Sequence, residues 1–403
     1  MKTSQARDIP VSRRVSFTAG APLAKLLLVV ALNLGAGFAS ASAGIAAMPP
    51  AKNPLEKIFL SGHSLTNRPF PEYLERIVRA AGLSFTWNRQ YLEGSTIQQR
   101  TSGGPRRSGW EGYRSGIDRN DRPIDVLAEF KVAGQTPDTR YDALVITERN
   151  SLLSEVLWYD TVRALRNYQD AFAASNPGGA TYFFEPWFRI DKNDPQRWIA
   201  YETAASPAWG CVVTAVNASL EADGRADRII PVPVALGLAR LVERSLGPAR
   251  LPGLSDASDH DVLDKLFSDD VHPTPATAYY TALFFFAKVW DRSPVGAWAP
   301  EDMDKALVKT LQDTAYSVAG QTRRDAGMDL ASCRSYMGWS FQWTFWPFMN
   351  DMSLRKDLGY MKARLVLAKH MLGSVRYFWK NEPPNPFADP KTLKGHYWLP
   401  PPS

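Results

Sequence analysis

The chain has 403 residues, of which 45% are hydrophobic and 22% charged, so it is able to bury a large core and is neither a disordered nor a collagen-like chain. Two cysteines exclude a disulfide-rich scaffold and a cysteine-rich metal module. The formal net charge of +6 raises the question of a polyanionic partner, and the distribution of the charges along the chain decides it.

The first 43 residues have the pattern of a secretory signal peptide. A basic stretch containing Arg13 and Arg14 precedes an apolar run at residues 26–39, and Ala41-Ser42-Ala43 is a small-residue cleavage site. The apolar run is shorter than the roughly 20 residues of a spanning helix, which disfavours a membrane anchor. The basic pair resembles a twin-arginine signal, with Phe17 one place late. The sequence therefore predicts a periplasmic or secreted protein.

Cleavage after Ala43 removes most of the net charge. Lys+Arg falls from 47 to 42 and Asp+Glu from 41 to 40, which leaves a charge of +2. The mature chain therefore gives no reason to expect a nucleic-acid partner. In an oxidising compartment Cys211 and Cys333 are able to pair, but the sequence leaves a disulfide and two buried free thiols equally open.

After the leader, apolar runs of strand length alternate with segments of helical periodicity. The expected strands are residues 57–61, 83–87, 143–147, 180–185 and 228–234. The expected helices are residues 69–81, 151–174, 206–222, 236–245 and 274–290. Strands separated by helices predict an α/β fold with a parallel sheet covered on both faces. Ligands bind at the carboxyl ends of such strands, so the loops at residues 91–122 and 188–205 are expected to line a substrate cleft.

Two short motifs point to a nucleophilic serine and its base. Gly62-His63-Ser64-Leu65 follows the first strand, where a turn projects the serine hydroxyl above the sheet edge, although for this motif taken alone an ordinary turn is the better explanation. Asp269-Asp270-Val271-His272 comes just before a helix. His272 suits the role of general base for Ser64, and Asp269 is close enough to hold the other ring nitrogen. The alternative role for His272 is structural, at the start of the helix.

In this order, the two motifs resemble those of the SGNH (GDSL-type) hydrolase family, over roughly residues 55–290. The resemblance implies a three-layer α/β/α fold with about five parallel strands, a hydrolase domain at residues 44–320, and a triad of Ser64, His272 and Asp269 that needs neither cofactor nor metal. The chain has His63 where the family usually has Asp. That position is not the nucleophile, so the expected catalysis is unaffected.

The resemblance also implies a glycine and an asparagine that complete an oxyanion hole with the backbone N–H of Ser64. Gly94 is the candidate glycine, with Gly103-Gly104 as the alternative. Asn150 is the candidate asparagine, although it is offset from the family's place for that residue, which leaves Glu148 or Thr147 as replacements.

Three further residues are expected to contact the substrate. His63 adjoins the candidate nucleophile, and Glu185 and Trp187 stand at the end of the fourth expected strand, on the same rim as Ser64 if the sheet is parallel. A strand-terminating turn with a packed tryptophan is the alternative for the last two.

Residues 321–403 form an aromatic-rich extension beyond the resemblance. Its aromatic cluster fits helix and strand spacing equally, and is expected to belong to the core rather than to stack on sugars or lipid: Trp339, Phe341, Trp343, Phe345, Trp346 and Phe348. A heptad from Leu354 to Trp379 predicts one amphipathic helix of about 30 residues, capped by Asn350 or Asp351. This helix is expected to pack on the α/β domain. A dimer seam and a peripheral contact of its basic face with anionic membrane lipid are the alternatives, so the oligomeric state stays open.

The sequence thus predicts an exported serine esterase that hydrolyses acyl esters on a small molecule or a polysaccharide. Acetyl esters on carbohydrate are favoured by the export signal and by the tryptophan-rich extension. A lipase or lysophospholipase is the alternative within the class. An O-acyltransferase with the same triad and a non-catalytic envelope or carbohydrate-binding protein are the alternatives outside it.

Overall fold

Five parallel strands form the centre of the fold, in the order β2-β1-β3-β4-β5. They are β1 (Lys57–Gly62), β2 (Thr86–Tyr91), β3 (Ala143–Thr147), β4 (Ala180–Phe184) and β5 (Ile229–Val232). The computed structural model describes residues 55–400 except 105–108, 256–257, 323–326 and 394–396, so the predicted signal peptide lies outside the described residues. The central strands are apolar and buried on both faces, as parallel strands between two helical layers must be: all five residues of β3 are buried.

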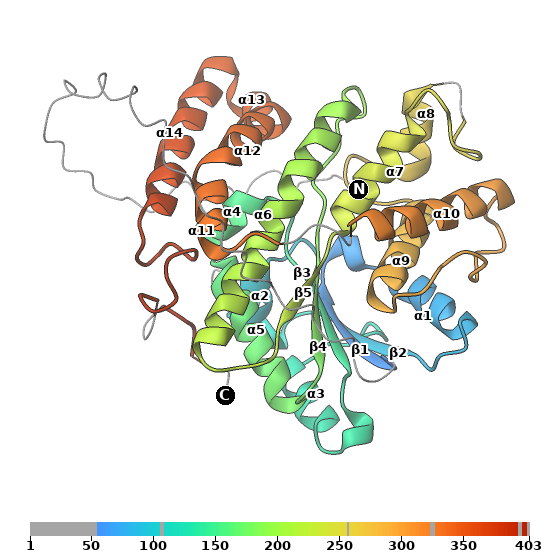
Figure 1. The fold of residues 1–403 in the computed structure, drawn as a ribbon, viewed down its shortest axis with the longest axis horizontal. Helices are drawn as coiled ribbons and strands as arrows, with labels where there is room; N and C mark the ends of the chain where they lie inside the picture. The colour runs from blue at the N-terminus through green and yellow to red at the C-terminus, as the bar shows by residue number, and fades with distance from the viewer. Residues whose placement is uncertain (1–54, 105–108, 256–257, 323–326, 394–396, 401–403) are drawn as a thin grey trace, which may run out of the picture. The chain divides into compact units, whose positions relative to one another are not determined.

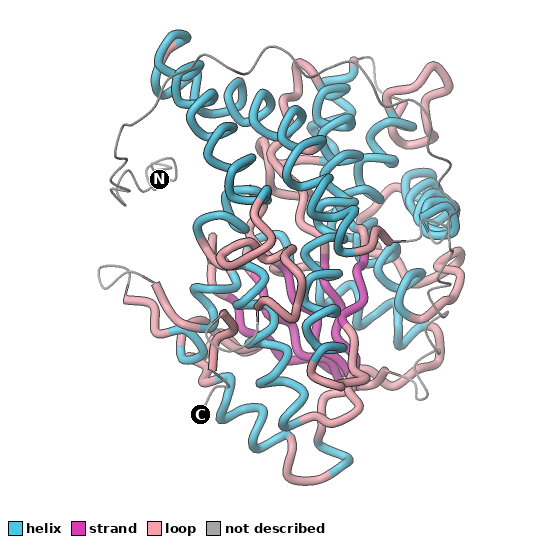
Figure 2. The backbone as a smooth tube through the Cα atoms, turned by 60° about the vertical axis from the view of Figure 1, so that its left-hand side comes forward, coloured by secondary structure: helices cyan, strands magenta, loops and turns pink. Residues whose placement is uncertain are grey.

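Helices cover both faces of this sheet (Figure 1). One face carries α1 (Phe70–Ala80), α7 (Val234–Ser245) and α9 (Pro275–Val289), with α10 (Lys305–Gln321) packed on α7 and α9. The other face carries α5 (Thr161–Ser175) and α6 (Pro195–Ala222). Figure 2 shows the strands enclosed between these helices. The fold is therefore a three-layer α/β/α sandwich with a parallel five-stranded sheet, as the sequence predicted.

The strand order makes the sheet doubly wound. From β1 the chain moves outward to β2, crosses back to β3, and then continues to β4 and β5 on the other side. The carboxyl ends of β1 and β3 are neighbours, with Ser61 paired to Ile146, at the point where the winding reverses. A crevice forms at such a point because the connections leave in opposite directions. The Ser64 turn follows β1 and residues 148–150 follow β3, so both lie at the edge of the sheet where the winding reverses.

The edge strand β2 differs from its predicted position. The sequence favoured the apolar residues 83–87, whereas the structure has Thr86–Tyr91, with Lys57 of β1 paired to Thr86. Polar residues of β2 are buried because they find hydrogen-bond partners there. Gln90 Nε2 donates to the backbone carbonyls of Gly112 and Ser115 at 3.1 and 2.9 Å. Hydrophobic periodicity does not detect a strand that is buried through polar contacts.

Two predicted helices also have different bounds. The segment expected as one helix at residues 151–174 is two, α4 (Leu152–Trp158) and α5, separated by Asp160 at φ +48°. The helix expected to start at residue 206 begins at Pro195, so residues 195–205 of the predicted loop 188–205 are helical, with Pro207 inside the helix. Helices that the sequence did not predict are α2 (Ile97–Thr101), α3 (Val126–Ala133), α8 (Asp259–Leu266) and α10.

The C-terminal extension packs on α6 in the same compact unit as the sheet. It consists of α11 (Leu330–Ser335), the π-helical turn η5 (Tyr336–Ser340), α12 (Gln342–Met349), a second π-helical turn η6 (Asn350–Leu354), α13 (Arg355–Leu358) and α14 (Tyr360–Trp379). Phe341 and Phe345 are fully buried around Tyr201 of α6. Cys211 of α6 and Cys333 of α11 form a disulfide. Within the described ranges, none of the helices has the length and apolarity needed to cross a bilayer.

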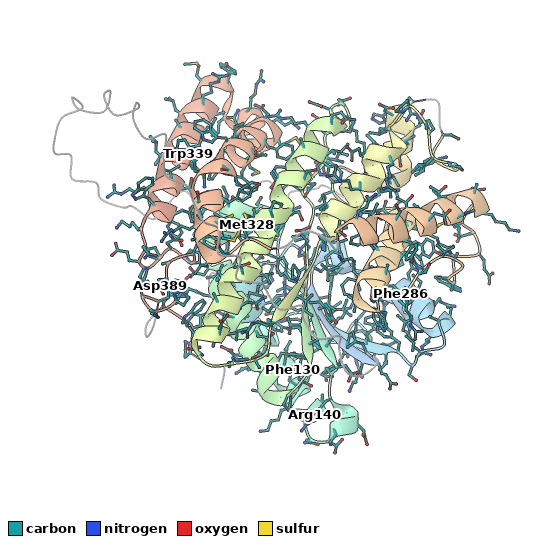
Figure 3. All side chains as sticks on the ribbon, in the orientation of Figure 1. Phe130, Arg140, Phe286, Met328, Trp339 and Asp389 are labelled. Carbon is teal, nitrogen blue, oxygen red and sulfur yellow. A yellow bond between two sulfur atoms is a disulfide. The ribbon has the colours of Figure 1, made fainter. Side chains whose placement is uncertain are left out.

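The aromatic cluster and the long helix differ in part from the prediction. Trp339 and Trp343 are 56% and 57% exposed, and Figure 3 shows Trp339 among the C-terminal helices, on the far side of the sheet from Phe286 of α9. The predicted single helix is interrupted at Gly359, whose φ of +72° no helix accommodates, and Asn350 and Asp351 lie inside a helical turn rather than at a cap.

Candidate active site

Ser64 opens a single 3-10 turn, η1 (Ser64–Thr66), directly after β1. The turn is tight: the backbone N–H of Thr66 donates to the His63 carbonyl at 3.0 Å, and the Thr66 hydroxyl donates to the same oxygen at 3.2 Å. Gly62 is required here, because a Cβ at this position would lie 2.0 Å from Thr66 Oγ1. Ser64 is partly exposed while its neighbours His63 and Leu65 are buried, so the turn presents the serine at the sheet edge.

His272 and Asp269 lie in the loop between α8 and α9 and form a close pair. His272 Nδ1 donates to Asp269 Oδ2 at 2.6 Å, and Asp269 Oδ1 accepts the backbone N–H groups of Val271 and His272, each at 2.7 Å. Partial burial raises the pKa of the Asp269 carboxyl, but these hydrogen bonds outweigh it and hold the pKa below its usual range. Because the carboxylate fixes the proton on Nδ1, His272 Nε2 is left as the basic nitrogen.

The fold brings this pair close to the Ser64 turn. Burial is the main cause of the lowered pKa of His63, the residue before Ser64, and Arg100, Arg149 and lastly His272 add to it, so His272 lies within electrostatic reach of this turn. Within the described residues the Ser64 hydroxyl makes no hydrogen bond to His272. Such bonds between nucleophile and base are often long without substrate and shorten when it binds. The three predicted triad residues therefore share one edge of the sheet.

His63 is a buried structural residue, contrary to the prediction that it contacts the substrate. It is 3% exposed, and its Nε2–H donates to the backbone carbonyl of Glu148 at 2.9 Å. Burial above all, and then the charge of Arg100, lowers the pKa of His63 to about 3, so the ring stays neutral at physiological pH. A carbonyl only accepts, which fixes the proton on Nε2. His63 joins the β1 and β3 loops.

Gly94 and Asn150, the predicted oxyanion donors, lie in the loops that follow β2 and β3, at the same edge as Ser64. Gly94 adopts φ +64°, a conformation that favours glycine. The alternative pair is engaged elsewhere: the Gly104 N–H donates to the Trp110 carbonyl, and a Cβ on Gly103 would lie 2.5 Å from that oxygen. Gly94 therefore remains the candidate glycine.

Glu148, the alternative to Asn150, does not have the chemistry of an oxyanion donor. Its carboxyl oxygens accept hydrogen bonds from the backbone N–H groups of Ile97 and Arg149, at 3.0 and 2.7 Å, and from the Thr161 hydroxyl at 2.8 Å. Burial raises the pKa of Glu148, while the charge of Arg100 and these donors oppose the shift. A carboxyl surrounded by donors acts as an acceptor. Its role is to hold the loops.

Arg100 is a second buried charged residue that, like Glu148, holds these loops together. The sequence did not reveal this role. Arg100 is fully buried, and its guanidinium donates to Ser61 Oγ at 3.0 Å, to Ser95 Oγ at 2.8 Å and to the Thr147 carbonyl. Burial lowers the pKa of Arg100 to about 10, so it stays charged. Because it lies in a stretch rich in Gly, Ser and Arg, the sequence indicated only a loop.

Glu185 and Trp187 are buried, which contradicts the prediction that they contact the substrate. Trp187 is fully buried, and its indole N–H donates to the Val271 carbonyl at 2.8 Å. Glu185 is 2% exposed, and burial raises its pKa to about 8. The alternative of a packed tryptophan is therefore what the structure shows. Through Val271, Trp187 supports the loop that carries Asp269 and His272.

The described residues contain no group of three or more His, Cys, Asp and Glu side chains that could hold a metal ion. A polar cavity of about 840 Å³ opens at the amino ends of the strands, lined among others by Lys57, Arg79 and Asp142. It lies at the opposite edge of the sheet from Ser64. Because ligands of doubly wound sheets bind at the carboxyl ends, this cavity is not the candidate active site.

No family model matches the chain, and no curated protein matches it. Among solved structures, the chain is similar to the crystal structure of a DUF4886 family protein from Bacteroides uniformis, with 15% sequence identity and a TM-score of 0.43. The match covers 68% of this chain and 98% of the other. A likeness at this level carries no argument about function.

Proposed function

We propose that the protein is a serine esterase that uses Ser64 as nucleophile, His272 as general base and acid, and Asp269 as the carboxylate that orients His272. The observation that carries the proposal is the 2.6 Å contact between Asp269 Oδ2 and His272 Nδ1, at the sheet edge that also holds the partly exposed Ser64. It leaves Nε2 as the nitrogen available to a hydroxyl.

In this mechanism the Ser64 oxygen attacks the ester carbonyl carbon while its proton passes to His272 Nε2. The negative charge on the carbonyl oxygen is stabilised by the backbone N–H of Ser64, by Gly94 and by the side-chain amide of Asn150. The alcohol then leaves with the proton from His272. Water gives a proton to the same nitrogen and attacks the acyl-enzyme; His272 then returns that proton to the Ser64 oxygen, which releases the carboxylic acid and free Ser64.

We propose acyl esters of carbohydrates, acetyl esters first, as the substrate class. The Asp269 and His272 side chains are 51% and 35% exposed, so the base and its carboxylate are accessible from solvent. An accessible base suits an acyl group carried on a large, hydrated alcohol such as a polysaccharide. The predicted export signal supports a substrate at or outside the cell surface.

The direct test is hydrolysis of p-nitrophenyl acetate and its longer-chain homologues by the parent, by Ser64→Ala and by Ser84→Ala. Ser84 is exposed near the amino end of β2, away from the site, and serves as the matched control. We expect S64A to lose at least about 10³-fold in kcat and S84A to match the parent. Turnover that S64A leaves unchanged contradicts the proposal. A strong preference for long chains indicates a lipase instead, and acyl transfer to an added sugar without hydrolysis indicates a transferase.

A further inference from the structure

The helix α14 carries a line of large apolar side chains that the core does not cover. Their exposed fractions are 71, 70, 74 and 83%, in the order Met361, Leu365, Leu372 and Trp379. Separations of four and seven residues place them on one side of the helix. We call this set the apolar stripe. The helix packs inward through a different side, on which Ala363, Ser374 and Phe378 are at most 2% exposed.

Two exposed tryptophans belong to the segments η5 and α12, which pack on α14. Trp339 and Trp343 form an edge-to-face pair with ring centroids 5.7 Å apart. Gly338, next to Trp339, lies against Phe378, so closely that a Cβ on Gly338 would be 3.0 Å from the Phe378 Cβ. Trp379 follows Phe378 in the chain, so this close approach is at the end of α14 that carries Trp379.

The same segment concentrates the positive charge of the protein. Seven basic residues between positions 355 and 380 are exposed: Arg355, Lys356, Lys362, Arg364, Lys369, Arg376 and Lys380. The single acidic residue in that range is Asp357, so these 26 residues carry a net charge of +6, equal to that of the whole chain. Lys362 and Lys369 are seven residues apart and border the apolar stripe along the helix.

We propose that this face binds the surface of an anionic lipid bilayer, with α14 lying in the plane of the interface. A line of Met and Leu enters the boundary between headgroups and acyl chains, the basic side chains reach anionic headgroups, and tryptophans favour this interfacial depth. A second copy of the chain would bring one +6 segment against another, which is repulsive. Sugar recognition needs neither the aliphatic residues nor the charge. This inference is independent of the esterase activity.

The test is co-sedimentation of the protein with vesicles of phosphatidylcholine alone or of phosphatidylcholine mixed with phosphatidylglycerol, at low and high salt. Three variants are compared with the parent: M361Q/L365Q/L372Q in the apolar stripe, K362Q/K369Q beside it, and V132Q/V295Q/Y316Q as the matched control. The control replaces three residues that are 61, 49 and 50% exposed elsewhere. All proteins share the same N-terminus, so any contribution of residues 1–54 is common to them. Circular dichroism and the thermal midpoint verify that each is folded.

We expect the parent to bind the mixed vesicles, with an affinity that falls as salt is added. The affinity should fall on the order of a hundredfold in the stripe variant and of tenfold in the lysine variant, and it should not change in the control. Equal binding to both kinds of vesicle, or a stripe variant that binds like the parent, overturns the proposal. A parent dimer that the stripe variant converts to a monomer also overturns it, because the stripe is then covered by a second copy.

Discussion

The imidazole of His63 donates a hydrogen bond from Nε2 to the backbone carbonyl of Glu148 at 2.9 Å. These residues follow β1 and β3, on the two sides of the point where the winding of the sheet reverses. The Glu148 carboxylate also accepts the N–H of Ile97, in the segment that follows β2. Glu148 therefore connects the three loops that hold Ser64, Gly94 and Asn150.

Replacing Glu148 with alanine is expected to destabilise the protein by about 3–5 kcal/mol, because the N–H groups of Ile97 and Arg149 and the Thr161 hydroxyl lose a buried partner, and Arg100 loses a nearby negative charge. Urea unfolding measures the effect. Glu93→Gln, at an exposed position in the loop after β2, is the control and should stay within about 0.5 kcal/mol of the parent. Equal stability of E148A and E93Q would show that the carboxylate does not hold the loops.

Asp269→Asn is expected to lower kcat for p-nitrophenyl acetate by about 10³–10⁴-fold, because a neutral amide neither fixes the Nδ1 proton of His272 nor stabilises the imidazolium. The thermal midpoint should change little, since the side chain is half exposed. Asp270→Asn is the control, as Asp270 is its similarly exposed neighbour and its side chain makes a 3.8 Å contact with Arg189. If the two variants have equal kcat, Asp269 does not orient the base.

The double substitution C211S/C333S is expected to lower the free energy of unfolding by about 2–5 kcal/mol. The disulfide closes a loop of 122 residues and links α6 to the C-terminal extension, so its loss increases the entropy of the unfolded chain. Thermal unfolding with and without a reducing agent measures the effect. The reducing agent should destabilise the parent and leave the double variant unchanged. If the parent unfolds at the same temperature with and without the reducing agent, the prediction is contradicted.

Glu185→Gln is expected to become more stable relative to the parent as pH rises. Burial raises the pKa of Glu185 to about 8, well above that of an exposed glutamate, so the folded state binds more protons than the unfolded state between these two values. The free energy of unfolding of the parent therefore falls across this window, by up to about 1.4 kcal/mol per pH unit, and glutamine lacks this term. Urea unfolding of both proteins at several pH values tests it. Parallel pH profiles would contradict the assignment.

Phe341→Ala is expected to cost about 3–5 kcal/mol, because Phe341 is fully buried against Tyr201, Tyr336 and Phe345. Trp339→Ala, two residues away, should cost less than about 1 kcal/mol, because more than half of its side chain is exposed. Urea unfolding of the two variants separates core from surface within the same aromatic cluster. Similar losses in both would mean that Trp339 also belongs to the core.

The sequence predicted the parts of the protein that depend on local pattern. The apolar runs of β1, β3 and β4 are buried on both faces, so each stands out as a continuous hydrophobic segment. Asp269 and His272 are three residues apart, and a short turn is enough to bring their side chains together. For these elements, neighbours in the chain are also neighbours in space.

The tertiary structure alone decided the features that depend on distant partners. Arg100 and Glu148 resemble loop residues in the sequence, and they are buried because β1, β3, the segment after β2 and the start of α5 offer them matching donors and acceptors. The heptad in α14 predicts a buried apolar face, yet small Ala363 and Ser374 make the close approach to the protein and the stripe is left outside.

The formal net charge of +6 shows the same division. The sequence by itself determined that four of these units belong to the predicted leader and that residues 355–380 carry +6. Only the packing of α14 decided that this positive segment also exposes its large apolar side chains, because the side of a helix that is buried depends on what it meets in the folded protein.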